Sequence, residues 1–200
     1  MRGEWIEKGY TASFSELLID SGAYSLLGDP TLKICLTEYA DWASRFPNAT
    51  AIAGLDSIDG DFQKSLKNYA AGPGFPTFHD TAPDWLLDEL MPISRERGGW
   101  LGIGIKPNPT RNGREEWLKR TLRRVPSDIH VHGWALRIYS HFSRIDSFDS
   151  TAWWQVAMRF RKTLGNWLTY AEALELSLKQ IERETKLVAN DSTDQEEMFS

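Results

Sequence analysis

The stretch TAIAGLDSIDGDFQKSLKNYAAGPGFPTFHD, residues 50–80, contains two short apolar runs separated by a segment of helical period. The runs at 50–58 and 75–80 predict strands, and the segment at 61–71 predicts a helix because its apolar residues recur every three or four positions. A strand, a helix and a second strand at this spacing form a βαβ unit, whose two strands are parallel. We therefore expect an α/β fold.

The same alternation extends in both directions along the chain. Further strands are predicted at residues 16–22, 99–106, 129–136 and 143–150. Further helices are predicted at 36–46, at 82–96 with Pro83 in the first turn, at 113–125, and at about 153–164 and 169–188. Six strands fit either a shortened TIM-like (β/α) barrel or an open doubly wound sheet.

Polar side chains at the strand ends help to choose between these folds. Potentially reactive residues recur where the predicted strands end: Asp20, Ser21, Asp56, His79, Asp80, Lys106, His132 and Asp149. In a (β/α) barrel these ends converge on one mouth, whereas in an open sheet the outer strands lie too far apart to cooperate. The pattern favours a shortened or incomplete TIM-like barrel with C-terminal helices. No cofactor is expected, because the GIGIKP segment (102–107) has the wrong glycine spacing for a dinucleotide site.

The composition fits one domain of 200 residues, of which 41% are hydrophobic. We expect a single barrel domain over 1–188 and a flexible acidic tail over 189–200. The lone Cys35 excludes an intramolecular disulfide and a CxxC zinc site. Because the chain has neither a membrane-spanning apolar run nor the apolar core of a signal peptide, we expect a cytoplasmic protein without a membrane partner.

The formal charge of −5 is unevenly distributed along the chain. Residues 95–124 sum to +6, whereas residues 1–94 sum to −8. This basic block is either a solvated helix face or a patch that contacts nucleic-acid phosphates. Its cations are Arg95, Arg97, Lys106, Arg111, Arg114, Lys119, Arg120, Arg123 and Arg124.

The segment RIDSFDSTAWW, residues 144–154, contains two aspartates that cannot both face the mouth. Asp146 and Asp149 are three positions apart, so a regular strand directs them to opposite sides. Asp149 is nearer the C-terminal end of the strand and is therefore the candidate for chemistry, while Asp146 is expected to pair elsewhere, for example with Arg144. The alternative for Asp149 is that it caps a helix starting near Ala152.

Two other strand ends carry carboxylates. Asp20 is followed by Ser21 and Gly22, small residues that permit close approach of a ligand, and Asp56 ends the next strand. Each aspartate is either a helix or turn cap or a catalytic acid or base. Three carboxylates around one mouth would raise one another's pKa values and suit a nucleophile with a general acid or base.

The HVHG segment (130–133) directs His130 and His132 to the same face of a strand, as two metal ligands would be. Only His79 and His141 remain to complete such a site, so we expect no metal. The alternatives are a histidine that donates a hydrogen bond to a substrate or a carboxylate, and, for His130, a histidine of the core.

The chain has nine tryptophans. Trp42, Trp85 and Trp117 fall on helical patterns and are expected in the core. Three others lie beside the predicted mouth, where a flat ring could stack on a base or a sugar: Trp134, Trp153 and Trp154.

Six short motifs, in this order, resemble the tRNA-guanine transglycosylase superfamily, and most closely its DNA-directed branch, the deoxypurine-in-DNA protein A family. The motifs are LLIDSGAYS (17–25), AGLDSI (53–58), PTFHD (76–80), LGIGIKP (101–107), HVHGWAL (130–136) and IDSFDSTAWW (145–154). The resemblance covers roughly residues 16–160. It implies a TIM-like barrel that breaks the N-glycosidic bond of a nucleobase through an aspartate nucleophile at C1′ of the sugar.

The resemblance also implies roles for individual residues. Asp149 matches the nucleophile, Asp20 the second catalytic aspartate, and Asp56 the aspartate that recognises the base edge. Gly102 and Gly104 match a glycine strand that lines the base pocket, and His132 with Gly133 matches an HG element. Further substrate contacts are expected from strand-end and stacking residues: Ser21, Gly22, His79, Lys106, Trp134 and Trp153.

Two departures from the family affect the expected reaction. Cys35 alone cannot supply the family's Cys/Cys/Cys/His zinc site, which disfavours tRNA as substrate, and the leading strands are reduced to WIEKGYTASF (5–14). A more open site favours water over an incoming base. We therefore expect a DNA glycosylase that excises a modified base, such as a base of phage DNA, and leaves an abasic site.

The alternatives are exchange of guanine for a 7-deazaguanine, a non-catalytic nucleic-acid-binding barrel, and a metal-dependent hydrolase using His79, His132 and Asp149. The expected partner is DNA with a flipped-out or single-stranded base. Its backbone would contact Arg111, Arg114 and Lys119.

Overall fold

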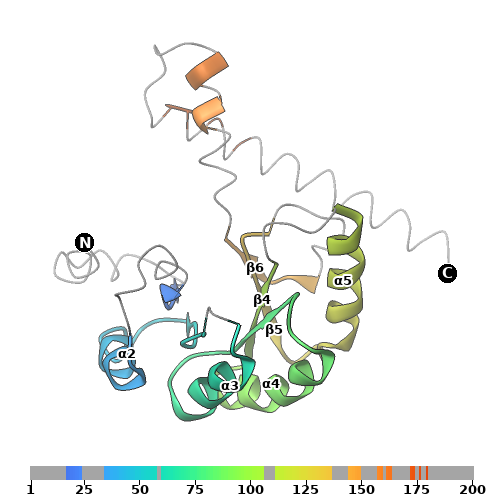
Figure 1. The fold of residues 1–200 in the computed structure, drawn as a ribbon. Coiled ribbons are helices and arrows are strands. Elements are labelled where there is room, and N and C mark those ends of the chain that lie inside the picture. Colours follow the sequence, from blue (N-terminus) through green and yellow to red (C-terminus); the bar gives the residue numbers. More distant parts are fainter. Residues whose placement is uncertain are drawn as a thin grey trace. The chain divides into compact units, whose positions relative to one another are not determined.

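The computed structural model describes residues 17–23, 34–57, 60–105, 111–136, 144–149, 157–159 and 161–163, with 172, 173, 176 and 179. Its named elements alternate between strand and helix for most of this length (Figure 1). In chain order they are β1 (Leu18–Ile19), α2 (Leu36–Ala43), β2 (Ala51–Ile52), α3 (Phe62–Ala71), β3 (Thr77–His79), α4 (Asp84–Glu96), β4 (Trp100–Gly104), α5 (Arg111–Arg124), β5 (His130–Trp134) and β6 (Ser147–Phe148).

Nine of these ten elements lie within a segment for which the sequence predicts that element, and α5 begins two residues before its predicted segment, 113–125. The strands are shorter than their apolar runs, because only part of each run pairs with a neighbour; β2, for example, has two residues inside the predicted strand 50–58. The residues described within the two predicted closing helices, at 157–159, 161–163, 172, 173, 176 and 179, are helical. The predicted tail, 189–200, lies outside the described residues.

The strands form a two-stranded sheet, β1-β2, and a four-stranded sheet, β3-β4-β5-β6. β1 and β2 pair in parallel, with Leu18 opposite Ala51, and β5 and β6 pair in parallel. A parallel bridge between Ala53 and Phe75 links the end of β2 to the start of the β3 segment. The predicted α/β class is therefore confirmed, but the described strands do not close into a barrel.

The chain divides into two compact units, one of residues 1–103 with 125–130 and one of residues 104–124 with 131–200. In the first unit most of the large, fully buried side chains come from β3, α4, β4 and the segments beside them: Phe75, Phe78, Leu86, Leu87, Leu90, Leu101, Ile103 and Ile129. Tyr39 of α2 and Tyr69 of α3 are also fully buried. The last four residues of β4, Leu101 to Gly104, are all buried, as in a parallel strand covered on both faces. α3 and α4 contact each other, and α4 contacts β3 (Figure 1).

In the second unit, apolar side chains of α5 and β5 are buried, among them Leu118 and Val131. Ala157 and Ala173, in the helical residues near the C-terminus, are also buried. The hydrophobic period read from the sequence therefore marks inward-facing positions of α5 correctly.

One core prediction is wrong. The side chain of Trp85, expected in the core, is 46% exposed, because α4 begins at Asp84 and its first turn carries Trp85 away from the buried positions Leu86, Leu87 and Leu90. Pro83 is the N-cap of this helix and precedes its first turn. Trp42 is partly buried and packs against the cluster of Ala23, Tyr39 and Leu55.

Gly74 permits a close backbone approach between β2 and the start of the β3 segment. Its φ is +92°, and a Cβ atom there would lie 2.6 Å from the carbonyl oxygen of Ile52. The neighbouring amide of Phe75 donates to that same oxygen at 2.7 Å. Any side chain at position 74 would therefore disturb the link between the two sheets.

We predict that Gly74→Ala destabilises the protein more than Gly98→Ala. Both glycines have a positive φ, so both substitutions cost about 1–2 kcal/mol of backbone strain. Nothing lies within 4 Å of a Cβ at Gly98, whereas Gly74→Ala adds a backbone collision of about 1–3 kcal/mol. Urea denaturation followed by tryptophan fluorescence measures the difference, and equal midpoints for the two variants would contradict the prediction.

Candidate functional site

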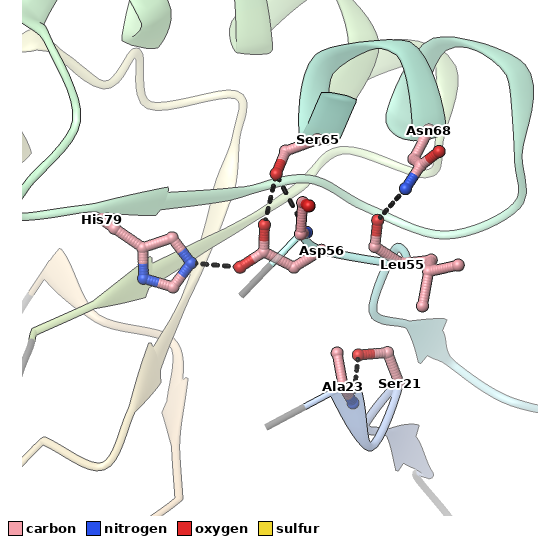
Figure 2. Close-up of polar contacts among 8 residues, drawn as sticks. Ser21, Ala23, Leu55, Asp56, Ser65, Asn68 and His79 are labelled. Carbon is pink, nitrogen blue, oxygen red and sulfur yellow. Dashed lines mark hydrogen bonds and ion pairs between the residues drawn. The ribbon is translucent and has the colours of Figure 1, made fainter. Parts of the chain in front are cut away.

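One face of α3 holds the segment that follows β2. Asp61 caps the helix by accepting the N–H of Lys64 at 3.0 Å, which fixes where its turns begin. Ser65, Asn68 and Tyr69 then share one side of the helix, because positions three and four apart are neighbours. Figure 2 shows Ser65 and Asn68 pointing from the helix toward Asp56 and Leu55. Asn68 donates to the carbonyl of Leu55 at 3.2 Å, and Ser65 Oγ accepts the N–H of Ser57 at 3.0 Å.

These contacts fix the residues on either side of Asp56. Both oxygens of the Asp56 carboxylate have partners (Figure 2). Ser65 Oγ donates to Oδ1 at 2.7 Å. His79 Nε2, from the last residue of β3, lies 2.6 Å from Oδ2. The Asp56 side chain is 16% exposed and that of His79 is 29% exposed, so the histidine is the more accessible partner.

The environment of Asp56 favours its ionised form. Burial is the largest single influence and raises the pKa, but hydrogen bonds and charge from His79, with hydrogen bonds from Ser65 and Tyr69, together outweigh it and lower the pKa of Asp56. The Tyr69 hydroxyl is buried beside Asp56 and Thr77 without a hydrogen bond of standard geometry, and burial followed by the charge of Asp56 raises its pKa. Tyr69 therefore stays neutral next to an ionised carboxylate.

The DSGA segment forms a tight turn after β1. Ser21 is buried and its Oγ accepts the N–H of Ala23 at 3.3 Å, while Gly22 has a φ of +70°, which favours glycine (Figure 2). Asp20, the candidate acid or base, is exposed at the start of this turn. Burial, with the charge of Asp20 second, raises the pKa of Tyr39, whose hydroxyl donates to the carbonyl of Ala53. The turn therefore presents Asp20 to solvent beside a buried tyrosine.

In the second unit, Asp149 follows β6 and contacts the turn after β5. Its N–H donates to the carbonyl of Gly133 at 3.1 Å, and its Oδ1 accepts the N–H of Ala135 at 2.6 Å. Ala135 has a φ of +52°, which is rare for a residue other than glycine and aims this N–H at the carboxylate. No other described residue besides Asp149 itself donates to Oδ2.

The Asp149 carboxyl reaches solvent, yet its pKa is raised. Desolvation by the surrounding chain raises it, and the backbone N–H groups of Ala135 and of Asp149 itself only partly offset this. Asp56 and Asp149 thus have pKa values shifted in opposite directions. The expectation that the strand-end carboxylates raise one another's pKa does not describe Asp56, because its neighbours are a histidine and hydroxyl groups.

The two aspartates of RIDSFDS contact different partners, as the alternation of side chains along a strand predicts. Oδ2 of Asp146 accepts the N–H of Val131 at 2.7 Å and lies 3.9 Å from Arg144 Nη1. The expected pairing of Asp146 with Arg144 is confirmed. The helix that Asp149 was alternatively expected to cap begins in residues that are not described.

His132 and Trp134 lie on the same face of β5. His132 is buried, its Nδ1 lies 2.8 Å from Ser147 Oγ, and its ring meets that of Trp134 edge to face with centroids 4.2 Å apart. Trp134 is half-buried. His130 is exposed and stacks on Trp100 at 5.0 Å, so the alternative of a core histidine there is wrong.

Two glycines of the predicted base pocket, Gly102 and Gly104, are buried in β4. Gly133 is buried in β5, where a Cβ would lie 2.4 Å from Leu136 Cδ1. At Gly133 a larger side chain would therefore require the Leu136 side chain to shift. Lys106, Trp153, Trp154 and His141 lie outside the described residues.

Several cations of the basic block are held by neighbouring groups of the protein. Lys119 pairs with Glu115 at 3.1 Å and with Glu116 at 3.7 Å on α5. Arg95 pairs with Asp128 at 2.8 Å, and Arg97 donates to the carbonyl of Ala70 at 3.0 Å. For these three residues the solvated, structural interpretation is favoured. Arg114 is half-buried, and Arg111 belongs to the first turn of α5.

The structure thus groups the predicted site residues in two places, Asp56 with His79 in the first unit and Asp149 with His132 and Trp134 in the second. The groups that orient these residues could not be identified from the sequence: Ser65, Tyr69, Ser147 and the backbone of Ala135. The one available signal was the polar face of the 61–71 helix, where serine, asparagine and tyrosine follow at positions three and four apart.

Comparison with protein family models, curated proteins and solved structures gave no match for this chain. Within the described residues, no three or more His, Cys, Asp or Glu side chains are grouped so that they could hold a metal ion. In that same part of the chain, no helix combines the length and apolar character needed to cross a bilayer.

We predict that Asp56→Asn destabilises the protein in a pH-dependent manner. Because folding lowers the pKa of Asp56, its ionised form stabilises the fold above the unfolded-state pKa of about 3.9, and this contribution is lost as the pH falls through the lower native pKa. At pH 7 the variant should lose about 1–3 kcal/mol of unfolding free energy. Below about pH 4, the difference in unfolding free energy between the variant and wild type should become smaller, as urea denaturation at a series of pH values would show.

Asp149→Asn is the matched comparison for this experiment. Because folding raises the pKa of Asp149, ionisation of this group works against folding, so the variant should gain stability relative to wild type as the pH rises through the native pKa. A difference between wild type and Asp56→Asn that does not change with pH would show that the ion pair with His79 does not govern the charge of Asp56.

Proposed function

We propose that this protein is a DNA glycosylase that breaks the N-glycosidic bond of a modified nucleobase through Asp149. The observation that carries the proposal is the geometry of Asp149 at the end of β6. The N–H of Ala135 donates to Oδ1 at 2.6 Å, while no other described residue besides Asp149 itself donates to Oδ2. A carboxylate oriented by one oxygen and open at the other is suited to attack a sugar carbon.

The reaction proceeds in two steps. The C1′–N bond breaks with its electron pair leaving on the base, and Asp149 Oδ2 bonds to C1′ as positive charge develops there. Water then attacks C1′, the bond to Asp149 breaks, and the proton of the water passes to a base, leaving an abasic site. The resemblance to the transglycosylase superfamily assigns this acid–base role to Asp20.

The topology supports a barrel-like arrangement of the strands. The order β1-β2, the bridge from β2 to the β3 segment, and the order β3-β4-β5-β6 follow the chain without a reversal. Doubly wound sheets reverse their strand order at a switch point, whereas (β/α) barrels add strands sequentially. We propose that these strands form part of an incomplete TIM-like barrel.

Substrate binding requires the target base to leave its stack. In this proposal the half-buried ring of Trp134 supplies a stacking surface, and the exposed arginines of α5, such as Arg123, contact the DNA backbone. Lys119 contributes less, because Glu115 and Glu116 already neutralise it.

The test uses genomic DNAs that carry ordinary bases, 7-deazaguanine or hypermodified cytosines. Mass spectrometry identifies released bases, and alkaline cleavage detects abasic sites. We expect wild type to release one base and leave abasic sites, and Asp149→Asn to be slower by roughly 10³-fold or more. Free guanine without abasic sites, appearing only when a deazaguanine is supplied, would indicate base exchange instead.

Asp146→Asn is the matched control. It changes a carboxylate three residues away on the same strand segment, which pairs with Val131 and Arg144 instead of facing the proposed substrate. We expect this variant to retain the wild-type rate. Equal rates for wild type and Asp149→Asn would rule out the nucleophile assignment.

A further inference from the structure

The turn after β5 contains a residue with unfavourable backbone geometry. Apart from glycines, Ala135 is the only residue with a positive φ, +52°, in the part of the chain that the structure describes. A Cβ atom makes this conformation unfavourable, so it persists only where the surrounding structure holds it. Residues held in this way gather at functional sites. The conformation of Ala135 is therefore a reason to ask what its backbone does.

Contacts on both sides of Ala135 hold the turn in this form. Gly133 lies opposite Phe148 in the parallel pairing of β5 with β6, and its carbonyl accepts the N–H of Asp149 at 3.1 Å. The buried side chain of Leu136 packs over Gly133 so closely that a Cβ there would collide with it. Ala135 lies between these two contacts, and its N–H donates to Asp149 Oδ1 at 2.6 Å.

The N–H of Ala135 favours negative charge on Asp149. Desolvation by the surrounding chain is the largest influence on this carboxyl and raises its pKa. The groups that oppose it are backbone N–H groups, those of Ala135 and of Asp149 itself. Both residues belong to the second unit, as do Gly133 and Leu136. An inference about this N–H therefore needs no group of the first unit.

The two steps of the proposed reaction make opposite demands on Asp149. In the first step Oδ2 gives an electron pair to C1′, and the carboxylate loses its charge. In the second step water attacks C1′, the bond from C1′ to Oδ2 breaks, and the proton of the water passes to a base. The electron pair of the broken bond returns to the carboxylate and spreads over both oxygens. A donor at Oδ1 favours this second step, because it contacts an oxygen on which charge develops.

We propose that Ala135 is a positioning residue whose backbone N–H promotes release of the sugar from Asp149; this inference rests on the proposed function. By occupying Oδ1, the N–H leaves Oδ2 to bond to C1′. It then stabilises the charge that returns to Oδ1 when water displaces the carboxylate. A hydrogen bond to a charged group corresponds to roughly 10–100-fold in the rate of this step.

The test removes the N–H and little else. L-lactic acid in place of Ala135 keeps the methyl side chain and replaces the amide N–H by an ester oxygen, which cannot donate. The substrate is the DNA whose base wild type releases, mixed with an excess of protein and quenched at intervals. Mass spectrometry then follows two quantities in a single turnover: the released base, and the adduct in which the sugar is bonded to the protein.

We expect the adduct to decay roughly 10–100-fold more slowly in the lactic acid variant than in wild type, with a smaller change in the rate of base release. If the N–H merely supports the fold, its loss slows base release and adduct decay alike. Equal slowing of the two steps would therefore overturn the proposal, as would an adduct that decays at the wild-type rate.

Ala135→Gly is the conservative variant. Glycine keeps the N–H and adopts a positive φ without strain, so the adduct should decay at the wild-type rate. Slow decay in this variant would show that the side chain, and not the N–H, carries the effect, and would overturn the proposal.

The matched control is α-hydroxyisovaleric acid in place of Val131. It removes the backbone N–H that donates to Oδ2 of Asp146 at 2.7 Å, so the same chemical change falls on the other aspartate of the segment. We expect a lower urea midpoint and wild-type rates for both steps. Slow adduct decay in this control would mean that loosening the strands is sufficient to produce the effect, and would overturn the proposal.

Failure of the proposed function is separable from failure of this inference. If wild type releases no base from any DNA, the glycosylase proposal fails and this inference fails with it. If wild type releases a base and its adduct decays equally fast with and without the N–H of Ala135, the inference fails alone. Base release by wild type without any adduct would also overturn the inference.

Discussion

The parallel pairing of consecutive strands is the constraint on which the candidate site depends. A helix between two parallel strands returns the chain to the same starting edge, so each strand ends where its neighbour ends. In the first unit this places Asp20 after β1, Asp56 after β2 and His79 at the end of β3, and the bridge between Ala53 and Phe75 links β2 to the β3 segment. In the second unit the same rule brings the end of β6 beside the end of β5, where Asp149 meets the backbone of Gly133 and Ala135. Chemistry-bearing residues therefore gather at strand ends because the backbone directs them there.

Much of this arrangement could be predicted from the sequence, because hydrophobic period is a local property. The apolar runs located all ten elements, and the spacing of Asp146 and Asp149 correctly separated their partners. The orientation of the side chains could not be predicted, since it depends on contacts between segments that are distant in the sequence. Nothing in the sequence around His79 indicates that its side chain contacts Asp56, 23 positions earlier. Likewise, nothing in the sequence at Ala135 indicates that its φ is positive. The exposure of Trp85 could not be predicted for a related reason. The residue at which a helix begins determines which way the side chains of its first turn point.

The two central carboxylates illustrate how environment divides roles between like groups. Asp56 is buried but surrounded by donors, so it stays ionised and serves to hold His79. Asp149 is stabilised only by backbone N–H groups, those of Ala135 and of Asp149 itself, and desolvation raises its pKa. In the function proposed above, the second of these carboxylates attacks the sugar.

The most direct test of the account is capture of the sugar on Asp149. A DNA oligonucleotide with a 2′-fluoro sugar at the target nucleotide is suitable, because fluorine destabilises positive charge at C1′ and slows the water step. The account predicts a covalent adduct whose mass equals protein plus oligonucleotide minus the base, located by peptide mapping at Asp149 and absent from Asp149→Asn. An adduct on another residue, or base release from this strand without any adduct, would contradict the account.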